Sequence, residues 1–62
     1  MEYSTLIKKY REKTFKTQRE LAKELGISFV TLNRWETGKF NPTMKMKKKL
    51  HSLFIKEGLV EE

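Results

Sequence analysis

Residues 17–39, TQRELAKELGISFVTLNRWETGK, contain two short helical patterns separated by little more than a Gly-Ile-Ser sequence. Thr17 and Glu20 have the spacing of a capping box, in which each side chain binds a free backbone N–H group at the start of a helix. Gly26 can adopt the left-handed conformation that ends a helix, and Ser28 is a typical N-cap for the next one. Because so few residues change the direction of the chain, the two predicted helices must cross steeply.

The second predicted helix, residues 28–37, carries side chains on its outer face that packing against the rest of the protein does not explain. A rotation of 100° per residue turns Leu32 and Trp35 inward. The side chains that lie opposite are Val30, Asn33 and Arg34, with Phe29 on the flank. The major groove of B-DNA offers thymine methyl groups to apolar side chains and guanine O6 and N7 to arginine. The pattern therefore indicates a helix-turn-helix unit that binds DNA, although tight helical corners also occur in ordinary small bundles.

Two more helical patterns flank this unit. Near the N-terminus, the apolar side chains that share one face are Tyr3, Leu6, Ile7 and Tyr10, which predicts a helix over about residues 4–13. Pro42 breaks the preceding segment, and Thr43 can cap a C-terminal helix over residues 43–57 that ends before Gly58. Its predicted inward stripe is Met46, Leu50, Leu53 and Phe54. The sequence therefore predicts the all-α class: one compact domain over residues 1–62 with four helices, or five.

Length and composition exclude several kinds of protein. A chain of 62 residues buries only about 60% of the surface that it exposes when unfolded, which allows one small domain. The absence of cysteine excludes disulfides and thiolate metal sites, and it fits a reducing compartment. No segment approaches the roughly 18 apolar residues of a membrane span or has the pattern of a signal peptide. We therefore expect a cytoplasmic protein.

The positive charge is concentrated late in the chain. The net charge is +6, and residues 39–56 contain six lysines and no acidic residue. Such a block can be a solvated helix face, or it can bind a polyanion such as DNA. It can also mark a basic amphipathic helix on an anionic membrane. We expect no membrane partner, because membrane binding leaves residues 17–39 unexplained.

Residues suited to catalysis or metal binding are scarce. His51 is the only histidine, and the chain has no Gly-rich phosphate loop and no carboxylate cluster at ligand spacing. We therefore predict that the protein is not an enzyme and uses no catalytic residue, metal, cofactor or small-molecule ligand.

The chain resembles the phage-repressor and Cro type of helix-turn-helix domain, shared with xenobiotic-response-element regulators. The motifs that carry the resemblance are Thr-Gln-x-x-Leu-Ala-x-x-Leu-Gly-Ile-Ser, Trp-Glu-x-Gly-Lys and Asn-Pro-Thr, and it covers about residues 4–54. It implies a lambda-repressor-like fold and a transcriptional regulator, most often a repressor, that binds specific double-stranded DNA sequences with the helix 28–37. It also implies a nucleoid-associated protein of a prokaryotic, phage-infected or plasmid-bearing cell. Protein-binding antitoxins and coactivators use the same fold, so a protein-binding module is the alternative.

The resemblance also assigns roles to individual positions. Those that match phosphate contacts are Gln18, Ser28, Lys39 and Asn41. Those that match base-reading positions are Phe29, Val30 and Arg34, with Thr31 and Asn33 as secondary candidates. Arg11 and Glu36 match two positions that often form a partly buried ion pair, and both the resemblance and our own interpretation make this pair structural.

Three features depart from the family pattern. The family commonly has glycine and then an apolar residue before Thr-Gln, where this chain has Phe15 and Lys16. We expect Phe15 to supply the missing apolar contact without the conformational freedom of glycine. Phe29 and Val30 stand where relatives often have polar amides, which favours contacts to thymine. Lys47 occupies a position that is commonly apolar.

The C-terminal helix has more apolar surface than one small core needs. Outside its inward stripe it carries Met44, His51 and Ile55, followed by Leu59 and Val60. We therefore expect a homodimer through the C-terminal region, with two recognition helices about 34 Å apart on a pseudo-palindromic operator. The alternative is that these side chains pack against the first helix of the same chain.

Overall fold

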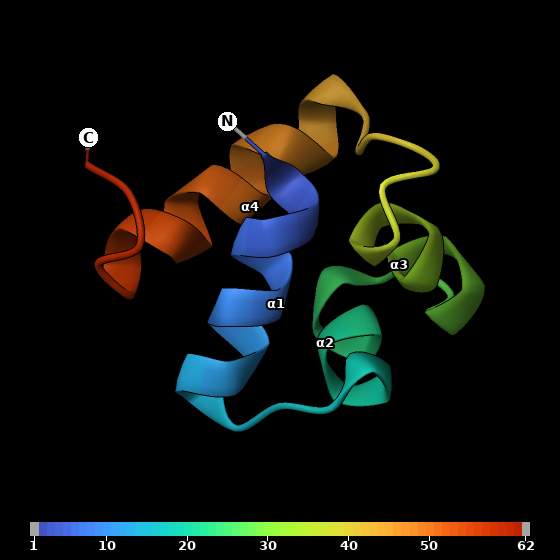
Figure 1. Cartoon of the computed structure of the whole chain (residues 1–62), viewed down its shortest axis with the longest axis horizontal. Coiled ribbons are helices and arrows are strands. Elements are labelled where there is room, and N and C mark those ends of the chain that lie inside the picture. Colours follow the sequence, from blue (N-terminus) through green and yellow to red (C-terminus); the bar gives the residue numbers. More distant parts are fainter. Residues whose placement is uncertain (1, 62) are drawn as a thin grey trace.

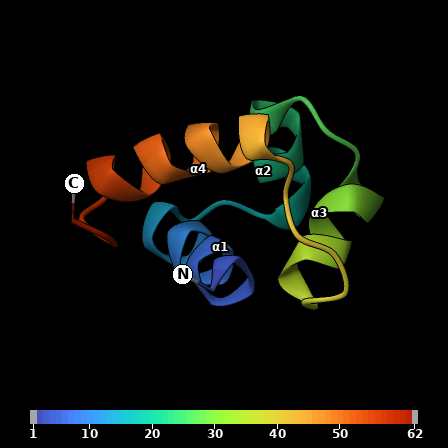
Figure 2. The same ribbon diagram turned by 90° about the horizontal axis from the view of Figure 1, so that it is seen from above.

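The computed structural model describes residues 2–61, which form four α-helices and no strand. They are α1 (Tyr3–Thr14), α2 (Gln18–Leu25), α3 (Phe29–Glu36) and α4 (Met44–Lys56). Helix α1 contacts both α3 and α4, and α2 contacts α3. In Figures 1 and 2, α3 lies at one end of the molecule and the C-terminal segment lies at the other. The all-α class and the arrangement of four helices are as predicted.

Side chains start the last three helices. Thr17 Oγ1 accepts a hydrogen bond from the Glu20 backbone N–H at 3.1 Å, and Glu20 Oε1 accepts one from the Thr17 N–H at 2.9 Å. This completes the predicted capping box of α2. The hydroxyl groups of Ser28 and Thr43 accept hydrogen bonds from the backbone three residues later, at the starts of α3 and α4. The predicted caps are therefore present in all three helices.

Two helices end in the left-handed backbone conformation, but only one of them ends at a glycine. Gly26 closes α2 with a φ of 72°, as predicted. Phe15 closes α1 with a φ of 57°, and the following Lys16 N–H donates to the Arg11 carbonyl at 3.0 Å. This geometry leaves the Phe15 side chain 92% exposed. The expectation that Phe15 supplies an apolar contact is wrong, because the backbone turn that ends α1 directs its ring into solvent.

Lys16 supplies the contact in its place. Its ammonium group lies 5.5 Å from the centroid of the Tyr10 ring and 2.5 Å from Glu24 Oε1 on α2. These contacts raise the pKa of Lys16, chiefly through the hydrogen bond to Glu24. A lysine with both an aliphatic stem and a charged end thus covers Tyr10 and links α1 to α2.

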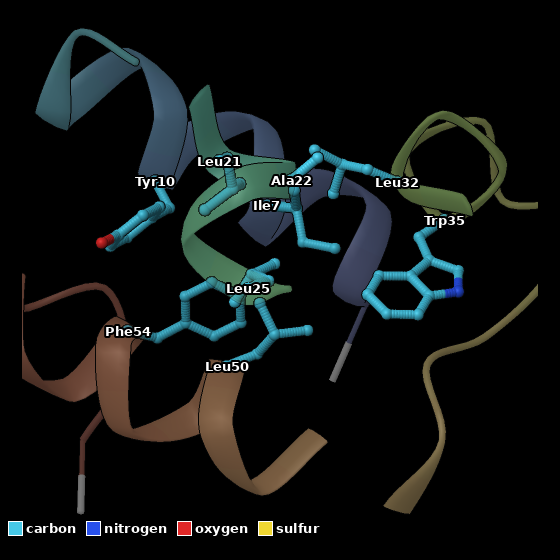
Figure 3. Close-up of a cluster of buried hydrophobic side chains, with 9 residues drawn as sticks. All are labelled: Ile7, Tyr10, Leu21, Ala22, Leu25, Leu32, Trp35, Leu50 and Phe54. Atoms are coloured by element: carbon cyan, nitrogen blue, oxygen red, sulfur yellow. The ribbon is translucent and has the colours of Figure 1, made fainter. Parts of the chain in front are cut away.

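One hydrophobic core joins all four helices (Figure 3). Its buried side chains are Ile7, Tyr10, Leu21, Ala22, Leu25, Leu32, Trp35, Leu50 and Phe54. The Phe54 ring packs edge-on against Tyr10, with the ring centroids 6.2 Å apart. Met46 and Leu53, the other members of the predicted stripe on α4, are partly buried against this core. Because α3 contributes Leu32 and Trp35, the core fixes which of its faces is exposed.

The segment after α4 returns to the same core. Gly58 turns the chain with a φ of 73°, and Leu59 and Val60 then pack against the core. The Lys13 ammonium group donates a hydrogen bond to the Glu57 carbonyl at the end of α4. Part of the apolar surface on which the dimer prediction rested is therefore covered within one chain, while Met44 stays exposed.

Candidate nucleic-acid interface

The exposed face of α3 carries most of the predicted base-reading side chains. Val30 is 55% exposed, and Asn33 and Arg34 are also exposed. Thr31 is only half-buried, but its hydroxyl oxygen lies 2.9 Å from Ser28 Oγ, so the two hydroxyl groups share a hydrogen bond. The outer face of α3 thus combines a β-branched apolar group, an amide and a guanidinium group, the mixture that can contact base edges in a major groove.

The first turns of α2 and α3 meet through an arginine and an aromatic ring. The guanidinium carbon of Arg19 lies 4.7 Å from the centroid of the Phe29 ring. Gln18, next to Arg19, begins α2, while Ser28 precedes Phe29 and caps α3. The structure therefore brings two predicted phosphate contacts to neighbouring helix N-termini, where the helix dipoles favour an anion.

The loop after α3 carries the remaining predicted phosphate contacts. Lys39 and Asn41 are exposed on it, and Gly38 adopts a φ of 79° that turns the chain after α3. Figure 2 shows this loop running from the end of α3 to the start of α4. Phe40, between the two predicted contacts, lies with its ring centroid 5.4 Å from the guanidinium carbon of Arg34. The loop is thus joined to the outer face of α3.

An ion pair orients α3 from its other end. Arg11 on α1 donates two hydrogen bonds to the Glu36 carboxylate, from Nε to Oε2 and from Nη2 to Oε1, each of 2.8 Å. The Glu36 side chain is only 3% exposed. The hydrogen bond to Glu36 raises the pKa of Arg11 above its ordinary value. The pair has the positions that the resemblance implied, and it fixes the C-terminal turn of α3 relative to α1.

With this geometry in place, comparison with known proteins identifies the family. Residues 7–56 match the model of the family described as helix-turn-helix. The chain belongs to this family. The helix-turn-helix chain is 42% and 38% identical, over 50 residues, to two proteins of Archaeoglobus fulgidus, each named an uncharacterized HTH-type transcriptional regulator. Those matches cover 81% of this chain and 70% and 71% of the two relatives. No solved structure matches the chain significantly.

The sequence alone does not indicate a role for two side chains of this helix-turn-helix protein. Arg19 and Phe40 each pair with a predicted base-reading residue, Phe29 and Arg34 respectively. Their signal in the sequence is weak, because an exposed arginine or phenylalanine is ordinary on a protein surface. An aromatic residue directly after the Gly-Lys of the motif was the one available indication.

The lysines of α4 lie mostly on its solvent face in this helix-turn-helix domain. Lys45, Lys48 and Lys49 are exposed, whereas Lys47 is half-buried with its ammonium group 5.5 Å from the Tyr3 ring centroid. Lys47 therefore covers the Tyr3 ring, at a position where the family commonly has an apolar residue. No helix within residues 2–61 combines the length and apolar character needed to cross a bilayer.

Proposed function

We propose that this protein binds specific double-stranded DNA sequences by placing α3 in the major groove, and that its occupancy represses transcription. Membership of the helix-turn-helix family makes it a DNA-binding transcription regulator. The observation that supports the proposed mode of binding is the outer face of α3, where Val30 and Arg34 are exposed while Leu32 and Trp35 are buried. No step of this function requires a chemical reaction.

The proposed contacts to DNA fall into two groups. Gln18, Ser28, Lys39 and Asn41 hold phosphates and set the register of the protein on the duplex. Phe29, Val30 and Arg34 select the sequence, with Thr31 and Asn33 in secondary positions. The exposed lysines of α4 add attraction that does not depend on sequence. Mutations in the two groups should therefore have different effects on DNA binding.

The first experiment is selection of bound sequences from a random duplex library. It should be carried out at about 0.15 M salt, because counterion release makes binding at low salt indiscriminate. We expect recovery of an inverted repeat with half-sites about one helical turn apart. If folded protein enriches no sequence, the proposal of sequence-specific binding is wrong, and a protein partner becomes the better assignment.

Arg34→Ala and Lys39→Ala should affect binding differently. We expect Arg34→Ala to cost about 1–3 kcal/mol on the selected duplex and to relax specificity at one base pair. Lys39→Ala should weaken all sequences alike and lower the slope of log K against log salt by about one. Titrations of both variants on the selected duplex and on a scrambled duplex test this. Equal losses on both duplexes for Arg34→Ala would remove it from the base-reading residues.

We also propose that the DNA-bound form is a twofold homodimer through the C-terminal region. Met44, at the start of α4, remains exposed and is available for such a contact. In such a dimer the two α3 helices should lie about 34 Å apart on a pseudo-palindromic operator. Sedimentation equilibrium should show two chains per selected duplex. A single chain, both free and on the full inverted repeat, would contradict the dimer.

A further inference from the structure

Within residues 2–61, Arg34 contacts an aromatic ring and forms no ion pair with a carboxylate. Its guanidinium carbon lies 5.4 Å from the centroid of the Phe40 ring, within the distance of a cation–π contact. The ion pairs formed by residues 2–61 are Arg11 with Glu36 and Lys16 with Glu24, and neither involves Arg34. Among the described residues, Phe40 is thus the recorded partner of the Arg34 guanidinium group.

Phe40 has no other evident role in the fold. Its side chain is 56% exposed, and it belongs neither to the buried core nor to the partly buried side chains that pack against it. The contact that the structure gives it is with Arg34, from the loop to the outer face of α3.

Stacking on a ring leaves an arginine able to bind a base. Where a ring covers one face of a planar guanidinium group, the N–H donors at the edge of that group still point outward. Two of those donors match guanine O6 and N7 in the major groove. A side chain that is already held in one orientation loses less conformational entropy when it binds, which increases affinity for the matching base.

We infer that Phe40 is a positioning residue for base recognition: its ring holds the guanidinium group of Arg34 so that the edge of the group meets a guanine. The inference rests on the proposed function, since it concerns the same face of α3. It adds a specificity-determining role to a residue outside the recognition helix. The acceptor is one G·C base pair in each half-site, and Phe40 itself needs no contact with the base.

The test compares sequence preference among variants. Selection with the wild type and with Arg34→Ala identifies the base pair that depends on Arg34. Binding is then measured on the selected duplex and on a duplex with that pair changed, for Phe40→Leu and Phe40→Tyr. We expect Phe40→Leu to reduce the ratio of the two affinities about two- to fivefold, as for loss of an exposed cation–π contact. Phe40→Tyr keeps the ring and should retain the wild-type ratio.

Controls separate positioning from a general loss of stability. Phe15→Leu removes another exposed ring, at the end of α1, and it should leave the ratio unchanged. In the Arg34→Ala background, Phe40→Leu should cause no further loss. Thermal melting of every variant should confirm that each is folded at the temperature of the binding assay.

Several results would overturn the inference. A Phe40→Leu variant with the wild-type ratio, or with equal losses on both duplexes, would show that Phe40 does not act through base recognition. An Arg34-dependent pair other than G·C, or no dependent pair, would do the same. Recovery of no consensus by the wild type would instead remove the proposed function itself, a result distinct from a consensus that is insensitive to Phe40.

Discussion

The partner of each arginine side chain decides its role in this protein. Arg11 binds the buried Glu36 carboxylate in a bidentate pair and is therefore structural. Arg19 and Arg34 lie against the rings of Phe29 and Phe40, and neither is in an ion pair within residues 2–61. These are the three arginines of the chain. Arginine suits both uses because its planar group can stack on a ring and can also form paired hydrogen bonds.

Phe15 offers a direct test of backbone strain at one residue. Its φ of 57° is unfavourable for a residue with a Cβ atom, and its ring is 92% exposed, so it contributes little packing. We expect Phe15→Gly to raise the free energy of unfolding by about 0.5–1 kcal/mol. Urea denaturation measures this change. A lower stability of Phe15→Gly would show that the ring contributes more than its exposure indicates.

Gly26→Ala is the matched reverse substitution. Gly26 has a φ of 72°, and a Cβ atom added there would meet no heavy atom within 4 Å. The substitution therefore tests backbone conformation alone. It should lower the free energy of unfolding by about 1 kcal/mol in the same urea titration.

At the scale of the helices, stability depends on how each one begins. Helices α2, α3 and α4 have side-chain caps, whereas α1 begins after Glu2 without one. The cap of α2 is the most complete, because Thr17 and Glu20 satisfy each other's backbone N–H groups. Glu20 also places a negative charge in the first turn of α2, where the helix dipole favours it.

This cap gives α2 a predictable response to pH. The hydrogen bond from the Thr17 backbone lowers the pKa of Glu20 below its ordinary value of 4.5. A lowered pKa in the folded state stabilises the protein above the unfolded-state pKa, and this stabilisation is lost as the pH falls through the folded-state pKa. Glu20→Gln can still accept the hydrogen bond but does not titrate. Its melting temperature should therefore fall less than that of the wild type between pH 6 and pH 3.

Thermal melts at a series of pH values provide the measurement. Glu61→Gln is the control, since it removes one carboxylate outside the helices and should follow the wild-type profile. Identical profiles for Glu20→Gln and the wild type would mean that the capping carboxylate does not contribute to the acid sensitivity.

The limits of the helices could be predicted because their signals are local. The capping box of α2, the Ser28 cap and Gly26 each act within a few residues, so a single sequence contains the full pattern. Phe15 broke this rule, since it ends α1 in the left-handed conformation, which a phenylalanine does not by itself indicate. The contacts of Arg19 with Phe29 and of Arg34 with Phe40 join different elements. They depend on helix crossing and on rotamers, which spacing along the chain does not specify.

At the scale of the whole molecule, one core and one buried ion pair hold α1 and α3 together. A domain of this size is marginally stable, with a free energy of unfolding no greater than about 5–15 kcal/mol. The buried carboxylate of Glu36 must keep its partner, because an unpaired buried charge is costly. The geometry of the proposed DNA-binding face therefore depends on Arg11, which lies on a different helix.

A Glu→Gln substitution should have different effects in the buried Arg11–Glu36 pair and in the partly exposed Lys16–Glu24 pair. Glu36→Gln should lower the free energy of unfolding by about 2–3 kcal/mol, because it weakens a desolvated bidentate pair. Glu24→Gln acts on the pair with Lys16, in which both side chains are about one-third exposed, and it should cost less than about 1 kcal/mol. Urea denaturation in low and high salt should show that only the Glu24→Gln effect fades with screening. Equal costs at both salt concentrations would contradict this difference.

Trp35 gives the protein an internal spectroscopic reporter. It is the single tryptophan of the chain, it is buried, and it lies on the inner side of α3, directly after Arg34. The indole emission therefore reports whether α3 is seated on the core, while circular dichroism reports on all four helices together. Coincidence of the two signals during denaturation would mean that α3 does not detach before the rest of the molecule unfolds. Because the indole is an intrinsic fluorophore, every variant described above can be monitored without a label.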